Sequence, residues 1–220
     1  MAWQGLALEA KSLACERGGR LIFKNLSFLV RSGQIIELRG PNGAGKSSLL
    51  RLLAGLNKAL SGSLTLTQCR HPDESQNLSQ AQKVSGFLRN DDFYGEQSHY
   101  IGHLEAVKPA LTVRENLEFW AGFQGGIADL ATLKLQHLAN DEARLLSEGQ
   151  RRRLSLSRLV SVKRPIWLLD EPTVGLDQST RADLRSLIKC HLAEDGLVIA
   201  ATHDDLELSK TRVLKLEAPS

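Results

Sequence analysis

A glycine-rich segment at residues 40–47 constrains the fold and chemistry of this chain more than any other feature. It reads Gly-Pro-Asn-Gly-Ala-Gly-Lys-Ser and matches the pattern G-x-x-x-x-G-K-[ST]. The largely apolar residues 34–39 before it predict a strand, and the apolar spacing over residues 47–54 predicts a helix. Glycines let backbone N–H groups turn inward onto phosphate oxygens, and a helix N-terminus adds roughly half a positive charge. The segment therefore predicts a phosphate-binding loop between a strand and a helix.

Two side chains of this loop have expected tasks. Lys46 should reach the β- and γ-phosphates of ATP, and the Ser47 hydroxyl should ligate Mg²⁺. The alternative, a glycine-rich turn without a ligand, leaves the strand before the loop and the helix after it unexplained. The expected nucleotide-binding residues are Gly40, Pro41, Asn42, Gly43, Ala44, Gly45, Lys46, Ser47 and Ser48.

A second apolar strand, expected at residues 166–169, ends in the carboxylates Asp170 and Glu171. Ligands of open α/β sheets bind at the carboxyl ends of the strands. We therefore expect Asp170 to face Mg²⁺ through a water molecule and Glu171 to polarise the attacking water as general base. Alone, the pair is equally compatible with an acidic turn that closes a core strand. His203 follows another apolar strand, at residues 197–201, and is expected to point at the γ-phosphate.

Short apolar strands alternate with helices along the chain, which predicts an α/β fold with a mainly parallel sheet. Thr112 and Glu115 form a capping-box pattern at the start of a helix. Residues 68–99 are polar and rich in Asn, Asp, Gln and Ser, so they predict an extended surface loop or insertion. Further strands are expected at residues 22–30, 64–67 and 213–216, and helices at residues 112–123, 130–139, 147–162 and 179–192.

Composition narrows the class of protein. The 220 residues are 42% apolar, enough for the core of one domain or of one domain with a small lobe. The net charge is only +3 and its cations are scattered, which argues against a nucleic-acid partner. Cys15, Cys69 and Cys190 have no zinc-binding spacing, so a reducing compartment fits them. Because no apolar run approaches ~18 residues and no secretion signal is visible, we expect a cytoplasmic protein that meets a membrane only through a partner.

Beside these motifs the chain carries Leu-Ser-Glu-Gly-Gln at residues 146–150. With it, the order of motifs resembles the ABC (ATP-binding cassette) ATPase family over nearly the whole chain. The segment is similar to the family's LSGGQ signature, with Glu148 in place of a glycine. Taken by itself, it would be a plain serine cap of a helix. The resemblance implies a homodimer in which this segment of one copy binds the γ-phosphate held by the other, through Ser147, Gly149 and Gln150.

The same resemblance implies a P-loop NTPase (RecA-like) core with a mainly parallel sheet, an antiparallel β subdomain and a small α-helical subdomain. Residues 1–220 would form a single ATP-binding domain, with the helical subdomain at about 112–162 and the polar insertion at about 68–99. Asp177 is similar to the family's D-loop aspartate, which lines the dimer interface. His203 matches the family's switch histidine.

Two positions depart from the family pattern. Arg17 stands where the family places an aromatic residue that stacks on adenine; a guanidinium plane can also stack on a base. His103 stands where the family has a glutamine that contacts Mg²⁺ or water and signals to the membrane partner, although a simple surface histidine is the alternative. The catalytic candidates are thus Lys46, His103, Glu171 and His203, and the metal ligands are Ser47 and Asp170.

Secondary motifs narrow the resemblance further. Residues 15–17, 100–103, 111–119 and 140–146 are similar to the ATP-binding subunits of cytochrome c maturation systems, the CcmA group. This implies a CcmB-like integral-membrane partner, further maturation membrane proteins, a peripheral location on the cytoplasmic face of the inner membrane, and a role in handling haem. The alternatives are an ABC ATPase for another transported substrate, or a non-transport ABC protein of DNA repair or translation. The latter usually bears a coiled-coil insertion or a second cassette, which this sequence lacks.

Overall fold

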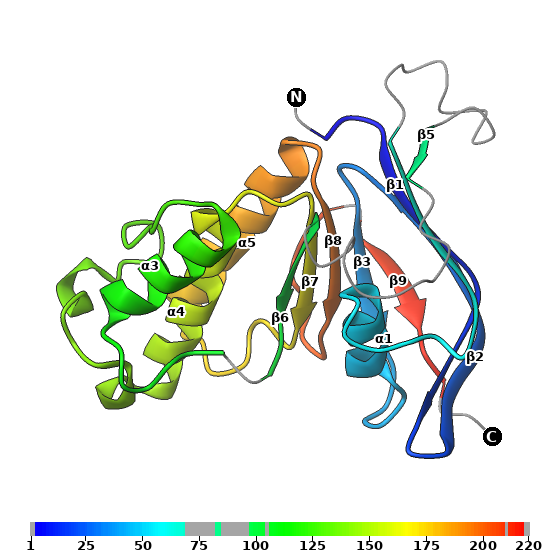
Figure 1. The fold of residues 1–220 in the computed structure, drawn as a ribbon, viewed down its shortest axis with the longest axis horizontal. Coiled ribbons are helices and arrows are strands. Elements are labelled where there is room, and N and C mark those ends of the chain that lie inside the picture. Colours follow the sequence, from blue (N-terminus) through cyan, green and yellow to red (C-terminus); the bar gives the residue numbers. More distant parts are fainter. Residues whose placement is uncertain (1–2, 69–81, 85–96, 104–105, 210, 218–220) are drawn as a thin grey trace.

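The computed structural model describes residues 3–68, 82–84, 97–103, 106–209 and 211–217. Within them, a parallel five-stranded sheet in the order β6-β7-β8-β3-β9 forms the centre of the molecule (Figure 1). Parallel strands end at the same edge of a sheet, so the segments that follow β3, β6, β7 and β8 converge there. The strands are β3 (Ile35–Arg39), β6 (Ser98–Ile101), β7 (Ile166–Asp170), β8 (Leu197–Ala201) and β9 (Arg212–Lys215).

A second sheet stands beside the first and is antiparallel throughout the described residues, in the order β2-β1-β4-β5. Its long hairpin joins β1 (Leu6–Arg17) to β2 (Arg20–Arg31), and β4 (Ser61–Gln68) and β5 (Gln82–Val84) extend it. The mixed α/β fold with a parallel sheet and an antiparallel β subdomain is therefore confirmed.

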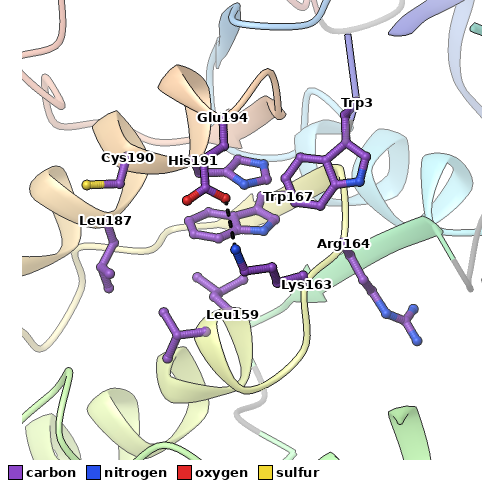
Figure 2. A pocket seen from close by; sticks show the side chains of 10 residues that line it. Trp3, Leu159, Lys163, Arg164, Trp167, Leu187, Cys190, His191 and Glu194 are labelled. Atoms are coloured by element: carbon purple, nitrogen blue, oxygen red, sulfur yellow. Dashed lines mark hydrogen bonds and ion pairs between the residues drawn. The ribbon is translucent and has the colours of Figure 1, made fainter. Parts of the chain in front are cut away.

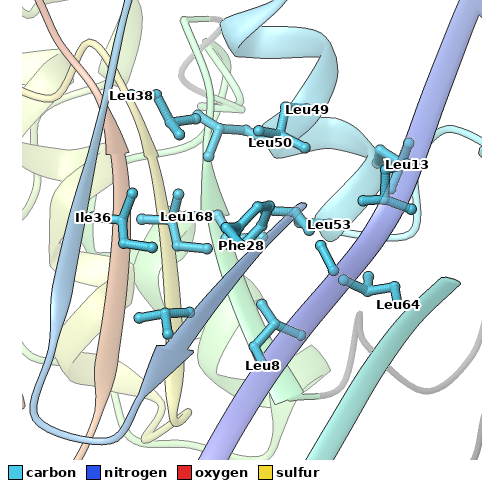
Figure 3. Packing of buried hydrophobic residues seen from close by; sticks show 14 of the residues in the cluster. Leu8, Leu13, Phe28, Ile36, Leu38, Leu49, Leu50, Leu53, Leu64 and Leu168 are labelled. Atoms are coloured by element: carbon cyan, nitrogen blue, oxygen red, sulfur yellow. The ribbon is translucent and has the colours of Figure 1, made fainter. Parts of the chain in front are cut away.

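The main hydrophobic core fills the space between the two sheets (Figure 3). Helix α1 (Lys46–Leu53) lies there and buries Leu49 and Leu50 completely. Leu8 of β1 and Leu168 of β7 belong to the same cluster, so both sheets contact the helix. Because α1 packs between two sheets, the loop that leads into it is anchored to the main core of the molecule.

A second cluster covers the other face of the parallel sheet. Helices α4 (Glu148–Ser161) and α5 (Gln178–Ala193) supply its apolar side chains, which pack on Val198 and Ala200 of β8. All residues of β7 and β8 are buried, as expected for parallel strands that are covered on both faces.

The helical subdomain has a small core of its own, which includes Val113, Leu117 and Leu154. It contains α3 (Val113–Gln124), the 3-10 turns η2 (Gln136–Leu138) and η3 (Ala143–Leu145), and α4. The predicted capping box is present, because the Thr112 side chain accepts from the Glu115 N–H while the Glu115 side chain accepts from the Thr112 N–H.

One predicted helix was wrong, and the predicted loop or insertion at residues 68–99 is only partly covered by the described residues. Residues 130–139 form turns and η2 in place of a helix. Asp129 accepts hydrogen bonds from the N–H groups of Ala131 and Thr132, and Lys134 has a φ of 57°, so local side-chain bonds and a left-handed residue replace the helix. Residues 68–99 are not simply a loop, because β5 and the start of β6 lie in this range; the rest of it falls outside the described residues.

Among the described residues, no helix combines the length and the apolar character needed to cross a membrane.

Candidate functional site

The predicted phosphate loop lies where expected, between β3 and α1. Two of its glycines have no room for a side chain. A Cβ on Gly40 would stand 2.2 Å from the Leu216 carbonyl oxygen, and one on Gly45 would stand 2.5 Å from the Ile22 side chain. Gly45 also has a φ of 95°, which L side chains rarely adopt. The pattern of glycines thus reflects the tight contacts of this loop with β2 and the segment after β9.

Lys46 begins α1, and its side chain folds back over the loop. The side-chain nitrogen Nζ donates to the carbonyl oxygens of Gly40 at 2.8 Å and Pro41 at 3.2 Å. Lys46 is buried, so its ammonium group is held against these carbonyl oxygens of the loop. This places a cation where a phosphate group on the loop would lie.

Ser47 and Asp170 meet across the site. Ser47 Oγ donates to Asp170 Oδ1 at 3.0 Å, which joins the start of α1 to the end of β7. Asp170 is buried. The pair offers the oxygen ligands that Mg²⁺ prefers, and magnesium sites typically use one or two protein oxygens together with phosphate and water.

Tyr100 of β6 also contacts this carboxylate, and its role was not anticipated from the sequence. Its hydroxyl donates to Asp170 Oδ2 at 3.4 Å and accepts from Arg51 Nε at 3.3 Å. The register pairs Tyr100 with Leu168 of β7, which brings the hydroxyl to the carboxyl end of its neighbour strand. Only strand order and register, which the sequence does not show, could have revealed this contact.

Glu171 and His203 face each other at the end of β7 and just beyond β8. The shortest distance between their side chains is 3.5 Å, from Glu171 Oε1 to His203 Nε2. The same nitrogen lies 3.1 Å from Asn42 Oδ1 and 3.4 Å from Lys46 Nζ. The structure therefore brings together the predicted general base, the predicted switch histidine and two residues of the phosphate loop.

Glu171 has an unusual backbone. Its φ of 47° lies in the left-handed region, which is uncommon for a residue other than glycine. Its N–H donates to the Ala201 carbonyl oxygen at 2.8 Å, which ties it to the end of β8. Non-glycine residues in this region cluster at functional sites, where the surroundings hold them in place.

The signature segment caps α4 and lies on the surface. Ser147 Oγ accepts from the Gln150 N–H at 3.3 Å, and Gln150 Oε1 accepts from the Ser147 N–H at 2.8 Å. Ser147 is exposed, and Gly149 and Gln150 are partly exposed. A Cβ on Gly149 would stand 2.9 Å from the Gly175 carbonyl oxygen, so this segment packs closely on the predicted D-loop.

Asp177 ends that D-loop and caps α5. Its carboxylate accepts from the Thr180 N–H at 2.7 Å and from the Ser179 hydroxyl at 2.9 Å. These bonds, with the backbone bond from Thr180 as the main cause, lower the pKa of Asp177 to about 2. The exposed residue therefore carries a full negative charge at neutral pH.

Two of the less usual predictions, His103 and Arg17, fall on exposed residues. His103 lies two residues beyond β6 with its side chain exposed. Arg17 is the last residue of β1 and pairs with Arg20 in the hairpin whose second strand carries Ile22 against Gly45. The described residues give neither side chain a contact that assigns its role, so both roles stay predictions.

A cavity of about 210 Å³ lies at the other end of β7 (Figure 2). Trp167, near the start of that strand, stacks on His191 with ring centroids 3.9 Å apart, and Trp3 tilts over the same imidazole. Burial lowers the pKa of His191 to about 4. None of the predicted site residues lines this cavity, which is therefore separate from the phosphate loop.

Sequence comparison identifies the family. The sequence model of the family described as ABC transporter matches residues 23–174, which include the phosphate loop, the signature segment and the acidic pair. The chain belongs to the ABC transporter family. The resemblance seen in its motifs is thus confirmed.

Within this family, the chain is 44% identical over 209 residues to the cytochrome c biogenesis ATP-binding export protein CcmA of Nitrobacter winogradskyi, covering 93% of this chain and 95% of that protein. It is 43% identical over 218 residues to the protein of the same name from Rhodopseudomonas palustris, with 97% and 99% covered. The resemblance to cytochrome c maturation subunits is therefore also confirmed.

Solved structures agree on the fold. The ATP-binding cassette MJ0796, described as a dimer in a post-hydrolysis state with ADP and Pi, matches 97% of both chains with a TM-score of 0.75 and 23% identity. A putative ABC transporter ATP-binding protein from Pyrococcus furiosus matches 96% of this chain and 97% of its own, with a TM-score of 0.72 and 20% identity. These similarities establish the ABC cassette fold of the chain.

Proposed function

We propose that this ABC ATPase binds and hydrolyses Mg-ATP to drive a membrane complex that handles haem for c-type cytochrome biogenesis. The convergence of Lys46, Ser47, Asp170 and Glu171 at one edge of the parallel sheet carries the ATPase part of this proposal. The relatives named as cytochrome c biogenesis proteins, similar over more than nine tenths of the chain, support the biological role.

The residues of the site divide the work of ATP hydrolysis. Backbone N–H groups of the phosphate loop and the Lys46 ammonium would bind the triphosphate, while Ser47 and Asp170 would hold Mg²⁺. When bound, Mg²⁺ would supply positive charge that offsets part of the charge of the triphosphate. Glu171 would accept a proton from the attacking water, and His203, 3.5 Å from that carboxylate, would orient both the carboxylate and the γ-phosphate.

Two copies are needed to complete each site. Ser147 and Gly149 lie at the exposed N-terminus of α4, where backbone N–H groups and the helix dipole favour an anion. In a head-to-tail homodimer, this end of one copy would contact the γ-phosphate held by the other. The dimeric form described for MJ0796, which shares the fold, supports this arrangement.

The membrane partner would dock on the helical subdomain. Phe119 and Phe123 of α3 stack on each other with centroids 6.4 Å apart, yet their side chains are 42% and 77% exposed. Lys108 Nζ lies 4.3 Å from the Phe119 ring centroid and adds a cation to this face. An apolar surface with a cationic edge fits an apolar, acidic cytoplasmic segment of a CcmB-like integral-membrane protein.

A complementation experiment tests the proposed role. The chain is expressed in a bacterium that lacks its own cytochrome c biogenesis ATPase, together with a CcmB-like membrane protein from the chain's own source. Haem-stained c-type cytochromes should reappear with the wild-type chain and not with Lys46→Ala. Mg-dependent ATP hydrolysis without any recovery of cytochromes would indicate a different transported substrate, and absence of ATP hydrolysis would refute the ATPase itself.

Docking can be tested separately by co-purification from detergent. Phe123→Ser should reduce recovery of the membrane partner several-fold, because it removes an exposed ring from the proposed face. Val213→Ser is the matched control, since Val213 is also exposed, at 54%, but lies on β9 of the core. Equal recovery with both variants would exclude α3 as the docking face.

A further inference from the structure

A buried arginine of α4 contacts the backbone at the carboxyl ends of two neighbouring strands, β6 and β7. Arg152 is only 4% exposed and lies one turn into the helix that begins after Ser147. Its Nη1 donates to the Gly102 carbonyl oxygen at 2.8 Å. Its Nη2 donates to the carbonyl oxygens of Asp170 at 2.9 Å and Glu171 at 2.7 Å. One guanidinium therefore joins the signature helix to the segments that follow β6 and β7.

Burial of a guanidinium group costs desolvation free energy unless its N–H groups are hydrogen-bonded. The three hydrogen bonds to carbonyl oxygens offset part of this cost. Hydrogen bonds from a charged donor are stronger than those between neutral groups. The fork of the guanidinium is planar and rigid, so the three carbonyl oxygens are held at fixed positions relative to one another. Arg152 is thus well suited to fix backbone geometry rather than to contact a phosphate.

The position of Glu171 depends on this fixation. Its left-handed φ of 47° is intrinsically disfavoured, and its peptide groups are held from two sides. The Glu171 N–H donates to the Ala201 carbonyl oxygen, and the Glu171 carbonyl oxygen accepts from Arg152. Because the side chain leaves the backbone between these two peptide groups, their orientation sets the direction of the carboxylate toward His203.

We propose that Arg152 is a positioning residue for ATP hydrolysis. Through the backbone, it orients the side chain of the general base Glu171. Through its bond to Gly102, it also fixes the position of the segment that leads into His103 relative to the signature helix. This inference rests on the proposed ATPase function. It predicts that loss of Arg152 slows the chemical step while nucleotide binding, which uses the phosphate loop, remains.

The test compares variants of the full-length chain in steady-state ATP hydrolysis and in equilibrium binding of a fluorescent ATP analogue with Mg²⁺. Arg152→Gln should lower kcat by about 100-fold, the loss typical of a misplacement near 1 Å, while KM and nucleotide affinity change by less than about threefold. Arg152→Lys should lower kcat by about tenfold, because one ammonium cannot reproduce the two-pronged contact.

Arg158→Gln is the matched control. Arg158 lies on the same helix, is also buried, and packs over the Trp120 ring at 4.0 Å. Within the described part of the chain it makes no hydrogen bond to Gly102, Asp170 or Glu171. A thermal melt of each variant separates loss of stability from loss of positioning. Arg158→Gln should keep its kcat within about threefold of wild type even if its melting temperature falls.

Three results would overturn the inference. One is a wild-type kcat in Arg152→Lys or Arg152→Gln. Another is an equal loss of kcat in Arg158→Gln at an equal loss of melting temperature, which would indicate a merely structural role. The third is a parallel loss of nucleotide affinity in the Arg152 variants. Absence of hydrolysis by the wild-type chain would refute the proposed ATPase function instead, so the two failures are distinguishable.

Discussion

Replacing Glu171 by glutamine tests the chemistry of the site with the smallest change of shape. Glutamine has the size of glutamate, and the hydrogen bond from the Glu171 N–H to the Ala201 carbonyl oxygen involves only the backbone. The Glu171 side chain is 22% exposed, and among the described residues the ionisable side chain that it approaches is His203, at 3.5 Å. The free energy of unfolding should therefore change by no more than about 0.5 kcal/mol.

The expected loss of hydrolysis rate in Glu171→Gln depends on the catalytic groups that this variant retains. A general base typically contributes about 100- to 10,000-fold in rate. In phosphoryl transfer most of the catalysis comes from positioning and charge stabilisation, which Lys46, Ser47 and Asp170 still supply in this variant. We therefore expect the lower half of that range, about 100- to 1,000-fold, which corresponds to roughly 3–4 kcal/mol of activation free energy.

Release of phosphate at saturating Mg-ATP gives the rate, and gel filtration with Mg-ATP gives the oligomeric state. Glu171→Gln should bind ATP with wild-type affinity and accumulate as a dimer, because the closed state can form but its nucleotide is not consumed. A variant that hydrolyses ATP at the wild-type rate would remove Glu171 from the role of general base. If Glu171→Gln stays monomeric with ATP although it binds ATP with wild-type affinity, this would contradict a nucleotide site shared between two copies.

Three further outcomes are expected. Lys46→Ala should weaken ATP binding by at least about 100-fold in a fluorescence titration, because about two charge-assisted hydrogen bonds to phosphate are lost; unchanged affinity would contradict the assignment. Ser147→Ala should lower the free energy of unfolding in urea by about 1 kcal/mol, because the helix cap is lost, and should abolish ATP-driven dimerisation. An ATP-bound dimer of normal stability would argue against the role of Ser147 at the dimer interface. Burial lowers the pKa of His99 to about 3 and of His191 to about 4, while an unfolded histidine titrates near 6.5. The unfolded chain therefore binds more protons between pH 4 and 6.5, so stability should fall as the pH drops through that window, by about 1.4 kcal/mol per pH unit for each histidine. His191→Phe should halve the slope measured by urea unfolding, and an unchanged slope would refute this.

The phosphate loop could be predicted from the sequence because its chemistry is local. Contiguous residues supply the glycines, the lysine and the serine, and the strand and helix on either side show in the apolar pattern. The acidic pair and His203 could be placed for a related reason. Each follows an apolar strand, and parallel strands end at one edge, so their convergence needs no knowledge of strand order.

Contacts that depend on strand order or on long-range packing could not be predicted. Tyr100 reaches Asp170 only because β6 is the neighbour of β7 in the sheet, although they lie far apart in the sequence. Arg152 stands between Arg151 and Arg153, and nothing in that run of arginines marks which of them turns inward. At residues 130–139, the side-chain bonds of Asp129 override an apolar spacing that is compatible with a helix.

The capping geometry of Ser147 explains how the signature segment can be stable in a single copy and still be able to bind a phosphate in the proposed dimer. In the capping box the Ser147 oxygen acts as acceptor toward the Gln150 N–H, so its own hydroxyl hydrogen can still be donated. The helix N-terminus is thus locally satisfied before any phosphate arrives, and it needs no refolding when a dimer closes. A serine provides both functions at once, whereas aspartate would provide the cap but would place a negative charge against the phosphate. In the proposed dimer, stability of the isolated chain and recognition of the other copy's nucleotide would therefore favour the same residue at this position.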